Sequence, residues 1–175
     1  VDAMSALAIS DDIFVINSFS KYFGMTGWRL GWLVAPQRYV REIEKLAQNL
    51  YIAPSTVAQH AALAAFRPET TAILEARRQE FSRRRDLLLP GLRKLGFKIA
   101  AEPRGAFYIY ADSSGLAADS FELAERLLTK AGVAATPGLD FGKNLPQSHM
   151  RFAYTIDGER IEEGLARMAR LLDAG

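Results

Sequence analysis

Two short apolar runs near the start of the chain predict β-strands. The first, IFVI at residues 13–16, combines β-branched and aromatic side chains without polar alternation. That pattern is typical of a strand covered on both faces, as in a parallel sheet. The second, LGWLVA at residues 30–35, stops at Pro36 and has the same character. The segment between them contains Gly24 and Gly27 and is expected to be a loop.

Three helices are expected to follow. Over residues 37–50 the apolar side chains recur every three or four positions, which is the period of one helix face. An alanine-rich helix comes next, and Ser55 and Thr56 can cap its start. It continues through Phe66, and Arg67-Pro68 closes it because the residue before a proline disfavours helical geometry. An apolar stripe through residues 69–95 predicts one long helix, which Pro90 is expected to kink or split.

The other face of this long helix carries many charges. These charges include Arg77, Arg78, Arg83, Arg84 and Arg85, which are interleaved with Glu75, Glu80 and Asp86. Opposite charges at helical spacing neutralise each other. We therefore interpret this face as solvated rather than as a binding site for a polyanion.

The pattern changes after Gly96 to short strands and two more helices. The expected strands are FKIA, AFYIYA, VAAT and MRFAYT, the first expected helix covers residues 120–131, and a second closes the chain. Together they predict a compact α+β unit. The fold class is therefore α/β, with three parts: an incomplete parallel sheet with helices at 1–67, a connecting helix at 68–95, and a small α+β domain at 96–175.

Composition narrows the function classes. The chain has 175 residues, 49% hydrophobic and 24% charged, as in ordinary globular proteins. A net charge of +2 is too small to indicate a nucleic-acid partner, and no apolar run reaches the roughly 20 residues that span a bilayer, so neither partner is expected. Cysteine is absent and the only histidines are His60 and His149, so we expect no metal site and a cytoplasmic location. The opening VDAMSALAIS has no basic region and no starting Met, and we expect it to be an internal cut.

The segment from Ser18 to Arg29, SFSKYFGMTGWR, carries the candidate chemistry. It follows a predicted strand, at the edge where open α/β sheets bind ligands. If the loop folds back, Ser18 and Arg29 can hold a phosphate through a hydroxyl and a guanidinium. Lys21 would then face the reactive end of the ligand, and a partly desolvated lysine beside a cation is nucleophilic enough to form a Schiff base. On spacing alone, a surface lysine and an ion-paired arginine remain the alternative.

The stretch SFSKYFGMTGWRLGW at residues 18–32 resembles the cofactor-lysine signature of the class I/II aminotransferases of fold type I, the aspartate aminotransferase-like enzymes. The similarity continues through all 175 residues. In that family the lysine holds pyridoxal 5'-phosphate (PLP) as an internal aldimine, and a serine three before it and an arginine eight after it bind the phosphate. The resemblance therefore implies that Lys21 is the catalytic residue and that Ser18, Lys21 and Arg29 bind the cofactor. Ser20 is expected only to form a hydrogen bond with the backbone of the loop.

A second candidate is Arg151, in the strand MRFAYT. Alternation along the strand places Met150, Phe152 and Tyr154 on one face and leaves Arg151 on the other, away from the apolar side chains. Such an arginine needs an anion, which is either an acidic side chain of the protein or a substrate carboxylate. In the family the substrate-carboxylate arginine stands in a similar context, so the resemblance implies Arg151 as the substrate-binding residue.

The resemblance also implies an activity, transfer of an amino group between an amino acid and a 2-keto acid by a homodimer. The family's acidic partner for the pyridine nitrogen, its stacking ring and its glycine loop precede the lysine motif. Asp11 and Asp12 cannot replace that acid, because a strand of about six residues places them some 20 Å away, at about 3.3 Å per residue. The chain is thus expected to be the C-terminal half of an aminotransferase, its first part a remnant of the PLP-binding domain, and inactive alone. A PLP-dependent β-lyase and a non-catalytic sensor domain of a transcription regulator remain alternatives.

Overall fold

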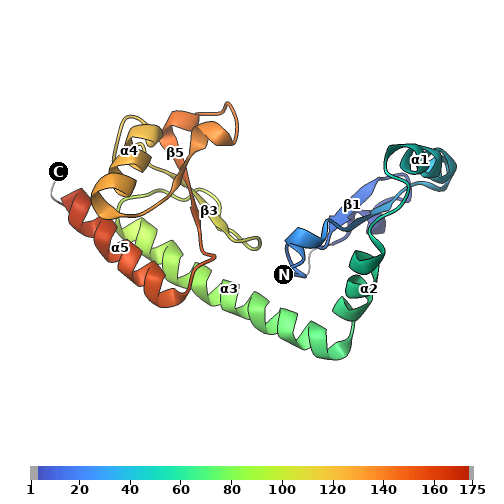
Figure 1. The fold of residues 1–175 in the computed structure, drawn as a ribbon. Coiled ribbons are helices and arrows are strands. Elements are labelled where there is room, and N and C mark those ends of the chain that lie inside the picture. Colours follow the sequence, from blue (N-terminus) through green and yellow to red (C-terminus); the bar gives the residue numbers. More distant parts are fainter. Residues whose placement is uncertain (1–3, 174–175) are drawn as a thin grey trace. The chain divides into compact units, whose positions relative to one another are not determined.

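The computed structural model describes residues 4–173, and the chain divides into two compact units, one ending at Arg78 and one beginning at Gln79. The first unit contains β1 (Val15–Ser18), β2 (Gly31–Val34), α1 (Gln37–Leu50), α2 (Thr56–Ala65) and the start of α3 (Pro68–Lys94), with short 3-10 turns at Ala6–Ala8 and Thr26–Trp28 (Figure 1). The division falls inside α3, and the expected three-part organisation stays a prediction.

The two strands of the first unit correct the expected sheet. β1 and β2 are antiparallel, with Ser18 opposite Gly31 and Val15 opposite Val34. A parallel pair needs a crossover of a dozen or more residues, usually a helix, whereas the chain between these strands is a loop with one 3-10 turn. The expected burial on both faces is also wrong within the described chain, since Ile16 is 81% exposed.

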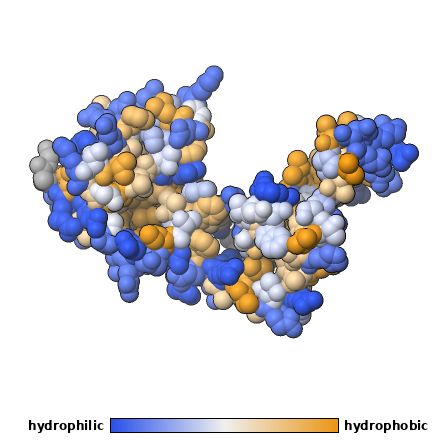
Figure 2. Space-filling model, in the orientation of Figure 1, coloured by the Kyte–Doolittle hydropathy of each residue, from blue (hydrophilic) through white to orange (hydrophobic). Residues whose placement is uncertain are grey.

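Apolar side chains reach the surface of the first unit at several elements, as the orange atoms in Figure 2 show for one face. Helix α1 has the bounds that its periodicity predicts, but none of its residues is buried; Leu46 and Leu50 are exposed. Helix α2 does bury its small residues, among them Ala58 and Ala62. Ser55 is its N-cap residue, although its side chain makes no capping hydrogen bond.

The second unit is built on a three-stranded antiparallel sheet in the order β3-β5-β4. Its elements are the rest of α3, β3 (Tyr108–Asp112), α4 (Ser120–Arg126), a π-helical turn (Leu127–Ala131), β4 (Thr136–Pro137), 3-10 turns at Gly138–Asp140 and Pro146–Ser148, β5 (His149–Ala153) and α5 (Gly158–Asp173). The expected strand FKIA is only a single bridge between Lys98 and Asp112. The expected helix 120–131 changes to π geometry at Leu127 and ends at Ala131, with Gly132 as its C-cap.

One face of this sheet forms the core of the second unit. Ile109, Ala111, Met150 and Phe152 alternate along β3 and β5 and are at most 5% exposed. They pack with buried side chains of three helices: Leu88 and Leu92 from α3, Leu123 from α4, and Ile161 and Met168 from α5. Burial of each such side chain stabilises the fold by about 1.5–3 kcal/mol. The sheet is therefore fixed from one side, and its other face is available for polar groups.

Helix α3 runs from Pro68 to Lys94 without being split at Pro90. Its predicted stripe is confirmed at Leu74, Leu88 and Leu92, which are buried. Its charged face forms ion pairs within the helix, among them Arg78 with Glu75 at 2.7 Å, so the solvated interpretation holds for these residues. A kink at Pro90 stays a prediction. Within residues 4–173, no helix has both the length and the apolar character that crossing a membrane requires.

Candidate functional site

The loop between β1 and β2 is anchored by an aromatic cluster. Phe19, only 6% exposed, directly follows β1, and its ring centroid lies 4.8 Å from that of Phe23, 5.1 Å from that of Trp32 and 5.8 Å from that of Phe66. Aromatic pairs at such separations contribute about 0.5–1.5 kcal/mol beyond burial. The residues on either side of Phe19, including Ser18 and Lys21, are thereby tied to a fixed point of the first unit.

Hydrogen bonds then fold the loop back on itself. The Phe19 N–H donates to the Leu30 carbonyl at 3.0 Å, and the Met25 N–H donates to the Phe19 carbonyl at 3.1 Å. The Thr26 hydroxyl donates to the Ser20 carbonyl at 2.7 Å. A side chain at Gly31 would meet the Asn17 carbonyl oxygen at 2.5 Å, so only glycine permits this close strand pairing. The fold-back that the phosphate hypothesis requires is therefore present.

Ser18 and Arg29 both lie at this end of the strand pair. The Ser18 hydroxyl oxygen accepts the Ser20 N–H at 3.0 Å, which leaves its own O–H to donate elsewhere. Ser20 thus enters the loop hydrogen bonds through its backbone. Arg29 has left-handed backbone angles, φ 51 and ψ 52, which are uncommon for a residue other than glycine. Such outliers concentrate at functional sites.

The Arg29 guanidinium is only partly used by the protein. Its Nη1 donates to the Thr26 carbonyl at 2.8 Å, and within residues 4–173 no carboxylate forms an ion pair with it. The expected alternative, an ion-paired surface arginine, is therefore wrong within the described chain. Arg29 also lines an open hollow of about 730 Å³, which is bordered by Gly27 and Ser55 but not by Ser18 or Lys21.

Lys21 lies in the turn after Phe19, where its carbonyl accepts the Gly24 N–H at 3.0 Å. The residue is exposed. The sequence predicts a partly desolvated lysine, and the described residues do not provide that cover.

Tyr22 ties the lysine turn to helix α3. Its hydroxyl donates to the Glu75 carboxylate at 2.6 Å, and Arg78 donates to the same carboxylate at 2.7 Å. The hydrogen bond to Glu75 raises the pKa of Tyr22 above its ordinary value. The hydrogen bonds from Tyr22 and then Arg78 lower the pKa of Glu75. The residue next to Lys21 is thus held by a charge-assisted contact.

Arg151 lies on the central strand β5, opposite Tyr110 of β3 and Thr136 of β4. The predicted alternation is confirmed: Met150 and Phe152 are in the core, and Arg151 is on the other face. The neighbouring strand adds Tyr108 and Tyr110 to that face of the sheet.

The guanidinium of Arg151 lies against two rings and has no anionic partner in the described chain. Its Cζ is 4.2 Å from the ring centroid of Tyr108 and 4.3 Å from that of Phe141. Its Nε is buried and has no hydrogen-bond partner. No carboxylate of residues 4–173 is within ion-pair distance of it. The acidic side chain of the protein, one of the two anions the sequence allows, is therefore not found among these residues.

Sequence reasoning missed both rings around Arg151. The position of Tyr108 could have been predicted, since alternation along the strand AFYIYA places it on the same face as Tyr110. Phe141 follows a 3-10 turn at Gly138–Asp140, and no periodicity relates a loop residue to a strand 10 positions later. Its contact with Arg151 arises only from the tertiary fold.

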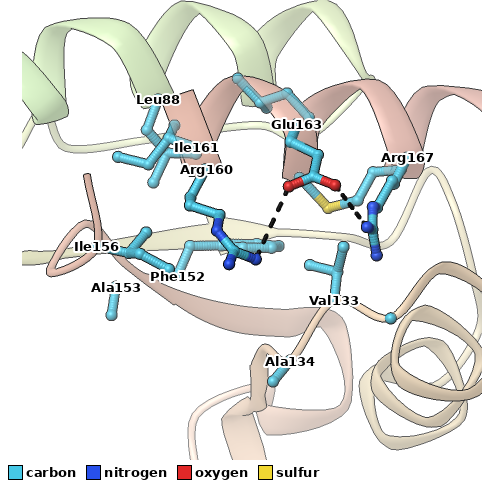
Figure 3. A pocket seen from close by; sticks show the side chains of 14 residues that line it. Leu88, Val133, Ala134, Phe152, Ala153, Ile156, Arg160, Ile161, Glu163 and Arg167 are labelled. Atoms are coloured by element: carbon cyan, nitrogen blue, oxygen red, sulfur yellow. Dashed lines mark hydrogen bonds and ion pairs between the residues drawn. The ribbon is translucent and has the colours of Figure 1, made fainter. Parts of the chain in front are cut away.

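A separate pocket of about 280 Å³ lies in the second unit, with the start of α5 on one side (Figure 3). Apolar side chains such as Phe152 and Ile156 line it. Glu163 bridges Arg167 at 2.5 Å and Arg160 at 3.9 Å along α5. None of the expected site residues lines this pocket, and its arginines are already paired. It is therefore not the predicted site.

The four expected residues fall in two units. Ser18, Lys21 and Arg29 share one folded loop of the first unit, and Arg151 belongs to the second. The donors of the first group suit a phosphate. The Ser18 hydroxyl can still donate its proton, and the Arg29 guanidinium, which lines a hollow, has N–H groups that the described protein does not bind. The amine of Lys21, which belongs to the same loop, suits an aldehyde. Within the part of the chain that the structure describes, no three His, Asp or Glu side chains are grouped to hold a metal ion.

Comparison with known proteins shows the family of the chain. Residues 2–168 match the family "Aminotransferase class I and II". The valine–pyruvate aminotransferase of Mycobacterium tuberculosis is 42% identical over 158 residues, which are 90% of this chain and 41% of that protein. The aspartate/prephenate aminotransferase of Thermus thermophilus is 40% identical over 90% of this chain and 40% of its own length.

Solved structures give the same result. A crystal structure of an aminotransferase from Mycobacterium tuberculosis superposes with a TM-score of 0.95 at 39% identity, covering 99% of this chain and 45% of that one. An aromatic aminotransferase from Pyrococcus horikoshii gives a TM-score of 0.83 at 34% identity, over 92% of this chain and 43% of the other. The chain therefore spans about two fifths of the length of the curated relatives above, and it belongs to the class I and II aminotransferase family.

Proposed function

We propose that the protein containing these 175 residues is a PLP-dependent aminotransferase, and that this chain is its C-terminal half. The observation that carries the proposal is the fold-back of the loop after β1: Ser18 and Arg29 are at one end of a strand pair, and Lys21 belongs to the loop that joins the two strands. Family membership and the aminotransferase names of the relatives support it.

In this proposal the first unit holds the cofactor. The Ser18 O–H and the Arg29 guanidinium bind the phosphate, since both retain donors that the described protein does not use. The Nζ of Lys21 would hold the cofactor at its aldehyde carbon. PLP, when bound, supplies an aldehyde for the amino group and a conjugated ring that stabilises negative charge at the substrate α-carbon.

The chain's own residues bind the substrate and move its proton. Arg151 binds the α-carboxylate of the amino acid or 2-keto acid, because its buried Nε and the absence of a nearby carboxylate leave the guanidinium uncommitted within the described chain. Lys21 removes the α-proton from the amino acid and returns it, as general base and then general acid. Exchange with a 2-keto acid completes the transfer of the amino group.

A cytoplasmic homodimer is part of the same proposal. The apolar side chains of Leu46, Leu50 and Ile52 are all at least 60% exposed, and such surfaces are commonly covered by further chain or by a partner. The absence of cysteine is compatible with a reducing compartment.

The test is amino-group transfer by the protein that contains this chain. A panel of amino acids is supplied with pyruvate or 2-oxoglutarate, and the new amino acid is measured. Transfer is expected, and Lys21→Ala should lower its rate by at least about 100-fold, whereas Lys45→Ala, at an exposed ion pair of α1, should leave it unchanged. Release of ammonia without transfer would indicate a lyase instead, and amino-acid binding without any product would indicate a sensor.

A further inference from the structure

Arg151 is enclosed by aromatic rings from two different elements. Tyr108 comes from β3, and Phe141 comes from the loop after the 3-10 turn at Gly138–Asp140. Each ring centroid is close to the guanidinium carbon, at 4.2 Å for Tyr108 and 4.3 Å for Phe141. Tyr108 also contacts the ring of Phe107, and Phe141 contacts the ring of Tyr110. Two separately packed rings therefore both contact the guanidinium.

The Phe141 ring is itself held in place. It meets the ring of Tyr110 edge-on, with centroids 6.3 Å apart and planes at 89°. Tyr110 is stacked on His149, at 4.9 Å and 12°. Gly138 allows the loop to lie this close to the sheet, because a Cβ there would be 2.8 Å from the Tyr110 hydroxyl and 2.9 Å from the His149 carbonyl. The ring over Arg151 is thus part of a packed row rather than a loose side chain.

If these two rings cover the faces of the guanidinium, only its edge remains open to an anion. The Nε part of that edge is buried, so the Nη nitrogens remain for an incoming oxygen. A planar carboxylate that approaches in the plane of the guanidinium can accept two parallel hydrogen bonds from them. The arrangement favours such an anion over one that must approach from above or below.

We propose that Phe141 is a positioning residue, which together with Tyr108 fixes the plane of the Arg151 guanidinium for in-plane recognition of the substrate carboxylate. The proposal rests on the proposed function of Arg151 and adds to it the residues that orient the arginine. Phe141 acts through Arg151 and touches no reacting atom.

The experiment measures the dissociation constant of pyruvate, a small 2-keto acid, by calorimetry on the PLP-loaded protein that contains this chain. Phe141→Leu keeps an apolar side chain but removes the ring, and Phe141→Tyr keeps the ring. We expect the leucine variant to bind pyruvate about tenfold more weakly and the tyrosine variant to stay within about twofold. Phe121→Leu, at an exposed phenylalanine of the same unit, is the matched control and should change nothing.

Two further readouts separate positioning from a merely structural role. The affinity for PLP, which involves only first-unit residues in our proposal, should be unchanged in Phe141→Leu. Arg151→Gln should weaken pyruvate binding by about 30-fold or more, and adding Phe141→Leu to it should cause no further loss, because the ring acts through the arginine. Tyr108→Leu should repeat the effect of Phe141→Leu and serves if that variant is unstable.

The outcomes distinguish the inference from the function on which it rests. If Arg151→Gln weakens pyruvate binding and neither ring variant does, the positioning role is wrong while the carboxylate role of Arg151 stands. Additive losses in the double variant would also overturn it. If Arg151→Gln itself has no effect, Arg151 does not bind the carboxylate, and both proposals fail at that residue.

Discussion

The hydroxyl of Tyr22 donates a 2.6 Å hydrogen bond to the carboxylate of Glu75, which joins the residue after the candidate lysine to helix α3. Each partner changes the proton affinity of the other. The pKa of Glu75 is lowered from its ordinary value of 4.5, and that of Tyr22 is raised from 10.0. The folded state is therefore most stable when the Glu75 carboxylate is charged and the Tyr22 phenol is neutral.

This contact predicts a pH window for the stability of the first unit. The depressed pKa of Glu75 contributes stability above its ordinary value, and that stability is lost as the pH falls through the folded value. The raised pKa of Tyr22 contributes stability below its ordinary value, and it is lost as the pH rises through the folded value. Glu75→Gln should lower the urea midpoint near neutral pH and have less effect towards pH 3.

Glu42→Gln is the control, because Glu42 forms an exposed ion pair with Lys45 on α1. Its effect on the urea midpoint should be small, as is usual for a surface ion pair. Urea midpoints of both variants and the parent are compared across the pH range. A loss for Glu75→Gln that is constant from acid to neutral pH would show that the carboxylate charge is not what holds Tyr22.

Gly138→Ala should destabilise the second unit by about 1–3 kcal/mol, as overpacking generally does. The added Cβ would lie 2.4 Å from the Pro146 carbonyl oxygen, and backbone cannot yield as a flexible side chain does. Gly115→Ala is the control, since nothing lies within 4 Å of a Cβ there. Urea denaturation measures both; equal stability of the two variants would mean that the loop carrying Phe141 is not packed as described.

Arg29→Ala should weaken PLP binding by about 10- to 100-fold, the usual value of a hydrogen bond to a charged group. Ser18→Ala should weaken it by about 2- to 10-fold. Both losses should disappear when pyridoxal, which lacks the phosphate, replaces PLP. Arg41→Ala, at an exposed pair on α1, is the matched control. An equal loss with pyridoxal would contradict the assignment of Arg29 to the phosphate.

Much of the helical structure could be predicted from the sequence, because helix periodicity is local. The bounds of α1 at Gln37–Leu50 and of α3 at Pro68–Lys94 follow from apolar spacing within each segment. The direction of β2 could not be predicted in that way. Strand direction depends on how the loop after Phe19 packs, and the same apolar run serves a parallel or an antiparallel strand.

In the candidate site, too, local features could be predicted and tertiary contacts could not. Ser18, Lys21 and Arg29 could be proposed from the sequence because the motif that resembles the aminotransferase signature lies within 12 residues. The left-handed backbone of Arg29 and the contact between Phe141 and Arg151 could not, since both depend on residues brought together by the tertiary fold. The exposure of α1 could not be predicted from the sequence either, because an apolar stripe does not indicate what covers it.

The central claim is that Lys21 is the residue that carries PLP. The most direct measurement incubates the chain with PLP, reduces with borohydride, and maps the labelled lysine by mass spectrometry of its peptides. The account predicts one dominant adduct, at Lys21, that disappears in Lys21→Ala and persists in Lys45→Ala. Labelling spread over surface lysines, or a dominant adduct at any other lysine, would contradict it.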